Sequence, residues 1–333
     1  MKQLNKDIAD RSFKQMYLLV GEEIYLKLLY KKKMKDALTE AYGMMNVSLF
    51  SEDGVDEKSI TDLGDTLPFL SEKRAIILEN TGFFKNKCEK LPDYLNNMPD
   101  YLILIFVEKD IDKRSKMYKA VSKLGYVAEF KRQTDADLES WICQTVKKEG
   151  KVINSADAHF LLERIGNDMS NISTEMEKLI CYNLKEEKIS RESILEITNE
   201  RVENKIFDMI KAVTEQKQHI ALKMYTDLLT LKEPPLRILY LIARQYNILL
   251  LSLEMSKQKM SANDIAGQIG VQGFVVRNAL PIARKYTPEF LRNAIEEVID
   301  METAVKSGKL SDVLSVELFI VKYSSVQSKK PYR

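Results

Sequence analysis

The chain has 333 residues, of which 45% are hydrophobic and 30% are charged, and its formal net charge at pH 7 is +2. This composition is that of a globular, water-soluble protein of two or three domains, and the small charge gives no global attraction to nucleic acid. The three cysteines, Cys88, Cys143 and Cys181, lie far apart without CxxC spacing. This argues against a disulfide framework and a zinc site, and it favours a reducing cytoplasm.

The first third of the chain alternates strand-like and helix-like segments. The N-terminal sequence MKQLNKDIADRSFKQ is charged throughout, so we expect no secretory signal there. Residues 23–43 and 113–125 have helical spacing, and each ends in a glycine, as is common just past a helix C-terminus. Between residues 16 and 131 five apolar runs read as strands: MYLLV, VSLF, AIIL, LILIFV and YVAEF. Strands that are apolar throughout predict a mostly parallel sheet covered on both faces.

Nucleotide chemistry is the first function to consider for such a sheet, because its ligands usually bind at the carboxyl ends of the strands. The first strand-to-helix turn, YLLVGEEIYLKLL, keeps only Gly21 of the GxxxxGK[ST] pattern. Glu22 and Glu23 would repel phosphate. The strand LILIFV is followed by Glu108 and Asp110, which are not the adjacent acidic pair of an ATPase. We therefore predict no catalytic site, no cofactor and no metal.

The segment DTLPFLSEKRAIILEN, residues 65–80, places large apolar residues just before a strand. Leu67, Pro68, Phe69 and Leu70 follow an acidic turn, where the chain should meet water. Pro68 has a fixed φ and no N–H donor, which disfavours the middle of a strand or helix here. Two interpretations remain open: these side chains pack under the turn, or they bind another protein.

A lysine run lies in the first long helical segment. Lys31, Lys32, Lys33 and Lys35 could contact phosphate groups, although a solvated lysine face is the commoner meaning of such a run.

From residue 135 onward the patterns predict only helices. The segment SADAHFLLERIGNDMSNISTEMEKLICYN reads as two helices, with Asn171 or Ser173 as the N-cap of the second. The longest apolar stretch, ILYLIARQYNILLLSL, is interrupted by Arg244, Gln245 and Asn247, so we expect a buried helix and no membrane span. The predicted domains are an α/β domain, 1–134; a small helical domain, 135–203; a C-terminal all-helical domain, 204–326; and a frayed tail, 327–333.

The segment SANDIAGQIGVQGFVVRNALPIARKY has the form of a helix-turn-helix, with Gly270 in the turn and residues 274–280 in the second helix. Such a unit can place its second helix in the DNA major groove. The second helix is apolar and carries a single arginine, whereas base readout needs polar side chains, so helix packing is favoured.

Five segments together resemble the delta subunit family of the bacterial DNA polymerase III clamp loader. They are YLLVGEEIYLK, LPFLSEKRAIILEN, LILIFVEKDIDKRSKMYKAV, DMSNISTEMEKLICY and VKSGKLSDVLSVELFIVKY. The resemblance covers nearly the whole chain. It implies an AAA+-like domain that has no working nucleotide site, followed by a small helical domain and a collar-type oligomerisation domain.

The resemblance also implies a function in DNA replication. Members grip the ring-shaped sliding clamp (beta) with an apolar wedge and help to open it for loading onto primed DNA. Here the wedge falls on Phe69 and Leu70, with Leu67 and Pro68 shaping it, and Leu67 is the alternative to Leu70 as the second apolar anchor. The implied partners are the clamp, the ATP-supplying motor subunits (gamma/tau), delta-prime and primer-template DNA, which the lysines at 31–35 would contact. The resemblance implies a cytoplasmic protein that is a non-catalytic subunit of a DNA-directed DNA polymerase (nucleotidyltransferase) holoenzyme.

Two alternatives to this interpretation are a DNA-binding protein that uses its helix-turn-helix and a degenerate AAA+ ATPase that still turns over nucleotide. The lack of a zinc-type cysteine cluster and of a GKT sequence argues against delta-prime and the motor subunits.

Overall fold

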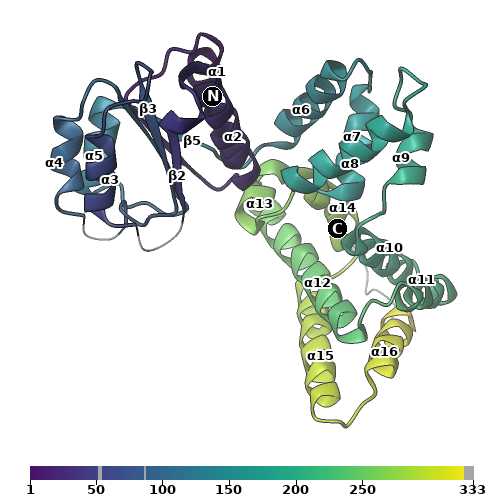
Figure 1. Ribbon diagram of the computed structural model, residues 1–333. Helices are drawn as coiled ribbons and strands as arrows, with labels where there is room; N and C mark the ends of the chain where they lie inside the picture. Colours follow the sequence, from purple (N-terminus) through teal and green to yellow (C-terminus); the bar gives the residue numbers. More distant parts are fainter. Residues whose placement is uncertain (52–54, 86–87, 326–333) are drawn as a thin grey trace. The chain divides into compact units, whose positions relative to one another are not determined.

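The computed structural model describes residues 1–51, 55–85 and 88–325. The chain divides into two compact units, residues 1–134 and residues 135–333. The first is an α/β unit and the described part of the second is helical (Figure 1). The predicted frayed tail, 327–333, lies outside the described residues, and the further division of the helical unit at residue 203 stays a prediction.

A five-stranded parallel sheet forms the centre of the first unit, and all five predicted strands are confirmed. Its strand order is β2-β3-β4-β1-β5. The inner strands are apolar because both of their faces are covered, whereas β2 and β5 lie at the edges and are only partly buried. The strands are β1 (Met16–Val20), β2 (Val47–Ser51), β3 (Arg74–Glu79), β4 (Leu102–Val107) and β5 (Tyr126–Glu129).

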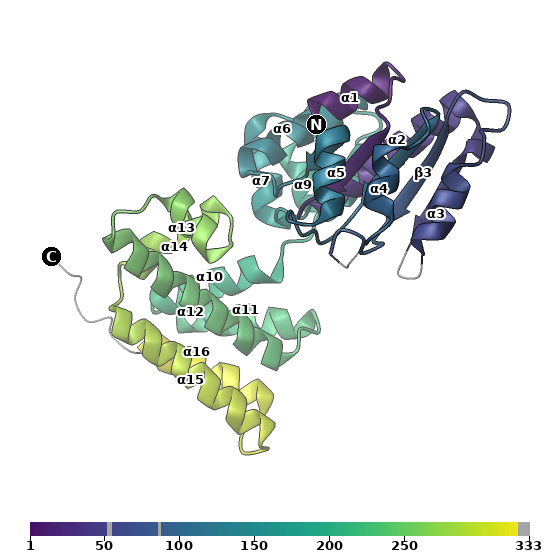
Figure 2. The same cartoon turned by 90° about the vertical axis from the view of Figure 1, so that its left-hand side faces the viewer.

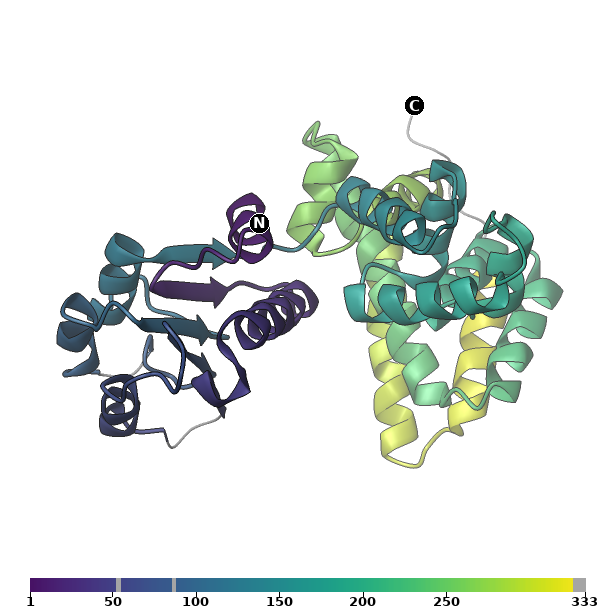
Figure 3. The same cartoon turned by 45° about the horizontal axis from the view of Figure 1, so that its top comes forward.

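Helices cover both faces of this sheet (Figure 3). α1 and α2 lie on one face, where α2 buries Met34 and Leu38. α3, α4 and α5 lie on the other face, where Ile60 and Val121 join the alternate strand residues in one core. The elements are α1 (Lys2–Ala9), α2 (Ile24–Tyr42), the 3-10 turn η1 (Met44–Asn46), α3 (Glu57–Gly64), α4 (Leu91–Asn96) and α5 (Lys116–Leu124).

Gly43 and Gly125 follow directly after α2 and α5, as expected from the sequence. Gly43 has a φ of +83°, whereas the φ of Gly125 is −122°, so Gly125 is needed for a reason other than a left-handed conformation. A Cβ on residue 125 would lie 2.6 Å from the carbonyl oxygen of Met16. The glycine therefore permits a close approach of the chain before β5 to β1.

The part of the second unit that the structure describes, residues 135–325, is built of helices joined by turns and loops. Its helices are α6 (Asp135–Lys148), α7 (Ser155–Ile165), α8 (Met169–Tyr182), α9 (Arg191–Ile197), α10 (Val202–Thr214), α11 (Gln218–Thr230), α12 (Pro235–Lys257), α13 (Ala262–Ile269), α14 (Gly273–Ala283), α15 (Pro288–Lys306) and α16 (Asp312–Ser325). Together, the α/β unit and these helices confirm the predicted fold class. α12 and α15 run side by side, and α10, α11 and α16 complete a core with them (Figure 2).

α12 is a core helix. It is long and apolar enough to cross a membrane by length and composition, but 61% of its most apolar window is buried inside the protein. Ile242, Tyr246 and Leu249 are fully buried in the core of the helical unit. This confirms the prediction of a buried helix.

The helices α6 to α9 are held by polar contacts as well as by apolar packing. The N-cap of α8 is Asp168, whose carboxylate accepts the Asn171 N–H at 2.8 Å, so the prediction of Asn171 or Ser173 as the cap is wrong. Asp168 suits this position because an Ncap side chain accepts an N–H from the first helical turn.

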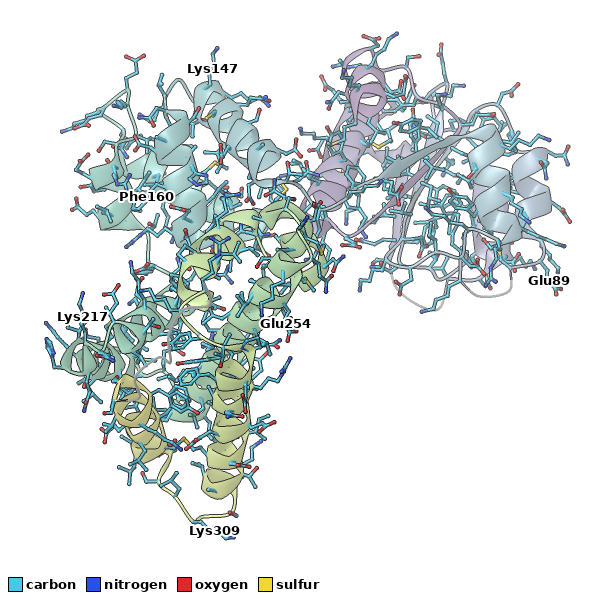
Figure 4. All side chains as sticks on the ribbon, turned by 180° about the vertical axis from the view of Figure 1, so that it is seen from behind. Glu89, Lys147, Phe160, Lys217, Glu254 and Lys309 are labelled. Atoms are coloured by element: carbon cyan, nitrogen blue, oxygen red, sulfur yellow. The ribbon has the colours of Figure 1, made fainter. Side chains whose placement is uncertain are left out.

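A cation–π contact links α7 to α9. The Arg191 guanidinium of α9 lies 3.7 Å from the ring centre of Phe160 in α7, which is labelled in Figure 4.

Candidate protein-interaction site

The loop of residues 67–70 connects α3 to β3 and presents its apolar side chains to solvent. Leu67 is 73% exposed, Phe69 56% and Leu70 92%, while Pro68 is partly buried. Local packing under the turn, the first of the two interpretations, does not describe these side chains. Three large apolar groups exposed within four residues are typical of a surface that binds another protein.

Two buried polar side chains hold the 67–70 loop from beneath. The Asn46 side chain accepts the Phe69 N–H at 2.7 Å and donates to the Phe69 carbonyl oxygen at 2.9 Å. It also donates to the Tyr42 carbonyl oxygen at the end of α2, at 2.8 Å. The Arg74 guanidinium donates to the Leu67 carbonyl oxygen at 3.1 Å. These bonds fix the loop backbone while its apolar side chains remain exposed.

The loop lies at the amino edge of the sheet. It precedes β3, and η1 precedes β2, the parallel neighbour in which Val47 is paired with Ala75. The two segments therefore lie side by side. Leu70 has a φ of +50°, a left-handed conformation that costs a leucine about 1–2 kcal/mol.

At the opposite, carboxyl edge, where nucleotides bind in α/β folds, buried groups satisfy one another. The Glu108 carboxylate is buried and accepts the N–H groups of Thr81 and Gly82, at 3.1 and 3.3 Å, and the Thr81 hydroxyl at 2.6 Å. The buried Lys27 ammonium donates to the Glu108 carbonyl oxygen at 2.8 Å. Burial raises the pKa of Glu108 and lowers the pKa of Lys27.

Gly21, the single remaining glycine of the phosphate-loop pattern, serves packing at this edge. Its φ is +121°, and a Cβ there would overlap the carbonyl oxygen of Phe130, the residue that follows β5. The next residues tie the turn to the same segment: the Glu23 N–H donates to Phe130, and Glu22 pairs with Arg132 at 3.2 Å. This turn is built for chain packing, and no feature of it is specific to phosphate.

The four lysines of the run at residues 31–35 of α2 are not equivalent. Lys31 is partly buried and forms an ion pair with Glu79 at 2.8 Å. Lys32, Lys33 and Lys35 are exposed, and the Lys33 ammonium lies 5.3 Å from the ring centre of Tyr30.

The helix-turn-helix consists of α13, a turn at Gly270 with a φ of +75°, and α14. The second helix turns much of its surface inward, because Phe274, Val276 and Ala279 are buried. Its arginine, Arg277, lies 3.4 Å from the Asn263 side chain of α13. These contacts favour helix packing over base readout.

Two family models match the chain. The DNA polymerase III, delta subunit model matches residues 17–131, and the DNA polymerase III delta subunit, C-terminal domain model matches residues 203–323. The chain belongs to the DNA polymerase III delta subunit family. As a member of this family it is a clamp loader subunit that takes part in DNA replication, as the resemblance implied.

Individual relatives agree with this assignment. The chain is 27% identical to DNA polymerase III subunit delta of Bacillus subtilis (strain 168), over 92% of both chains. It is 23% identical to a probable DNA polymerase III subunit delta of Aquifex aeolicus (strain VF5), over 74% of this chain and 72% of the relative. The solved structure of the Bacillus subtilis DNA clamp loader delta protein shares the fold, with a TM-score of 0.71, 24% identity and coverage of 98% and 99% of the two chains.

Two residues of the site, Asn46 and Arg74, are not marked by the sequence. Asn46 follows two methionines, and Arg74 begins an apolar strand, so each has the local pattern of an ordinary surface residue. Asn46 bonds to the backbone of Phe69, which the pairing of β2 with β3 brings near it, and Arg74 bonds to the carbonyl oxygen of Leu67, in the segment that leads into β3. No spacing along the chain could have identified them.

Proposed function

We propose that this delta-family subunit binds the sliding clamp through Phe69 and Leu70, with Leu67 and Pro68 shaping the contact, and helps to open the clamp ring. The observation that carries the proposal is the exposure of Leu67, Phe69 and Leu70 on a loop whose backbone is fixed by Asn46 and Arg74. A rigid backbone loses little conformational entropy on binding. The left-handed Leu70 supports the same role, since strained residues cluster where function requires a particular geometry.

Opening a ring requires that the protein bind the open clamp more tightly than the closed one, whatever its total affinity. Apolar anchors that fill a pocket typically contribute about 2 kcal/mol or more each, which is about 30-fold in affinity. Two such anchors supply enough free energy to shift an interface between open and closed states, if their pocket is better formed in the open ring.

The decisive experiment measures binding of the purified protein to the sliding clamp of the same organism, without nucleotide. We expect Phe69→Ala/Leu70→Ala to weaken binding by at least ~100-fold and to leave the circular dichroism spectrum unchanged. Leu124→Ala, at an exposed leucine of α5, is the matched control and should bind normally. Binding that survives the double substitution would move the clamp site elsewhere, and no binding to an active clamp would reject the clamp-opening role.

The C-terminal helices are proposed to join this chain to the motor subunits (gamma/tau) and delta-prime. In α16, Leu314, Leu318 and Val321 lie on one face at helical spacing and remain about two-fifths exposed. An apolar face left open on a core helix is typical of a subunit contact. We expect Leu314→Ser/Leu318→Ser to prevent reconstitution of the clamp loader while leaving binding to the isolated clamp intact.

The proposal assigns ATP turnover to the partner subunits and places the complex in the cytoplasm. The mutual pairing of Lys27, Glu108 and Thr81 at the carboxyl edge of the sheet supports this division, since those groups are engaged within the protein. A phosphate-release assay on the pure protein should show no turnover above buffer. Sustained turnover that Glu108→Gln abolished would instead favour a degenerate ATPase.

Contact with primer-template DNA is proposed for the exposed lysines of α2, Lys32, Lys33 and Lys35, with Lys31 held by Glu79. Replacing a lysine that binds a phosphate by alanine should reduce the salt dependence of DNA binding by the assembled complex by about one unit of slope. An unchanged slope for the triple alanine variant would remove these residues from the DNA path.

A further inference from the structure

A second exposed apolar pair lies beside the 67–70 loop. Met44 is 79% exposed and Met45 is 70% exposed, and both belong to η1, the turn that leads into the edge strand β2. Two consecutive methionines that protrude this far contribute nothing to the core of the α/β unit. Methionine is enriched at the centres of protein interfaces, where its flexible thioether adapts to the partner surface.

The geometry of Asn46 joins this pair to the loop. Asn46 is the last residue of η1, and its buried side chain makes three hydrogen bonds, two to the Phe69 backbone and one to Tyr42. A single amide therefore fixes both the turn that carries the methionines and the loop that carries Phe69. Since β2 and β3 are adjacent and parallel, both segments emerge at the same edge of the sheet.

We propose that Met44 and Met45 form the second half of the clamp-docking surface, which is thus built from two segments held together by Asn46. This inference rests on the proposed clamp binding and names further residues of the same interface. The partner is the apolar pocket region of the sliding clamp, because the hydrogen bonds of Asn46 hold the turn of Met44 and Met45 against the loop assigned to the clamp. Met44 and Met45 would contact the clamp beside the pocket that receives Phe69 and Leu70.

The test compares clamp binding of three variants of the full chain. Met44→Ser/Met45→Ser should lower the affinity at least fivefold with an unchanged thermal midpoint, since both side chains are exposed. Phe69→Ala/Leu70→Ala reports on the proposed function, and Leu124→Ser controls for loss of an exposed apolar side chain. A second measurement is crosslinking to the clamp from the photoreactive residue p-benzoylphenylalanine, which replaces Met45 or, as the control, Leu124. Crosslinking decides whether this segment contacts the clamp if Met44→Ser/Met45→Ser is unstable.

Crosslinking of the clamp from position 45 and not from position 124, together with the fivefold loss, supports the inference. If Met44→Ser/Met45→Ser binds within twofold of the unaltered chain, or if position 45 gives no crosslink, the inference is overturned. The proposed function still stands in that case if Phe69→Ala/Leu70→Ala weakens binding. If the unaltered chain fails to bind an active clamp, the proposed function and this inference fall together.

Discussion

Asn46 and Phe69 are joined by a reciprocal pair of hydrogen bonds in which the side-chain amide of one residue pairs with the backbone of the other, at 2.7 and 2.9 Å. The side-chain amide of Asn46 thus pairs with Phe69 as a neighbouring strand's backbone would, and it joins the turn before β2 to the loop before β3. Because Asn46 is buried and makes no contribution to the exposed surface, its effect on binding can be separated from that of the apolar anchors.

Asn46→Ala should weaken clamp binding about tenfold, although every exposed apolar side chain is retained. Loss of the amide leaves the Phe69 backbone unpaired and lets the loop fluctuate, so part of the binding free energy is used to order it. Calorimetric titration measures the affinity for the clamp, and hydrogen exchange at the Phe69 amide measures the order of the loop. Asn97→Ala, at an exposed asparagine after α4, is the control. Faster exchange with unchanged affinity would show that loop order does not matter for binding.

Glu108→Ala should destabilise the protein by about 2–4 kcal/mol, because it leaves the buried donors of Thr81 and Gly82 without an acceptor. Asp110→Ala, two residues later and largely exposed, should change the free energy of unfolding by no more than about 0.5 kcal/mol. Urea denaturation of both variants provides the comparison. A loss below about 1 kcal/mol for Glu108→Ala would contradict a structural role for the network.

Lys151→Met should cost about 2 kcal/mol and loosen the turn between α8 and α9. The buried ammonium of Lys151 donates to the carbonyl oxygens of Asn183 and Glu186, at 2.5 and 2.9 Å, near the C-terminal end of α8. Charged donors to backbone carbonyls are worth more than neutral ones, and methionine fills a similar volume without donating. Lys148→Met, at an exposed lysine of α6, is the matched control. Equal unfolding free energies for the two variants would refute the prediction.

Gly125→Ala should destabilise the α/β unit by more than about 2 kcal/mol, since the added Cβ would press on the Met16 carbonyl oxygen and force β1 and α5 apart. Gly267→Ala in α13 meets open space and should be neutral or stabilising by up to about 1 kcal/mol. Thermal unfolding of the two variants checks both signs. Similar midpoints would show that the chain relaxes around position 125.

Glu57→Gln should destabilise the protein by about 0.5–1 kcal/mol at pH 7 and by less as the pH falls. Partial burial acts to raise the pKa of Glu57, but the N–H groups of Leu91, Lys90 and Glu89 outweigh it and lower the pKa below the ordinary 4.5. The carboxylate therefore stabilises the fold above pH 4.5, and this contribution is lost as the pH falls through the folded-state pKa.

Urea denaturation of Glu57→Gln and the unaltered protein at pH 7, 5 and 4 measures this dependence. Glu149→Gln, at an exposed carboxylate, controls for the loss of a surface charge. A difference between Glu57→Gln and the unaltered protein that grew toward pH 4 would have the wrong sign for this explanation.

Much of the fold is predictable from the chain because its patterns are local. All five strands are runs of apolar residues, and those of β1, β3 and β4 become buried on both faces of the sheet. The prediction of the α8 N-cap was wrong within a local pattern, since the cap is Asp168, which precedes both of the residues expected there. The glycine after α5 was expected, but the close contact that requires it is tertiary, because a Cβ at position 125 would press on the Met16 carbonyl oxygen. The approach of Met16 cannot be read from the residues adjacent to Gly125 in sequence.

The sequence by itself determined the family, the parallel sheet, the helical remainder and the position of the apolar residues at 67–70, since each depends on residue type and on spacing along the chain. It left open whether Phe69 is buried or exposed. That was decided by the tertiary structure, in which the pairing of β2 with β3 brings Asn46 under the loop and Arg74 donates to the Leu67 carbonyl oxygen. Their hydrogen bonds satisfy the loop backbone, so its apolar side chains face water.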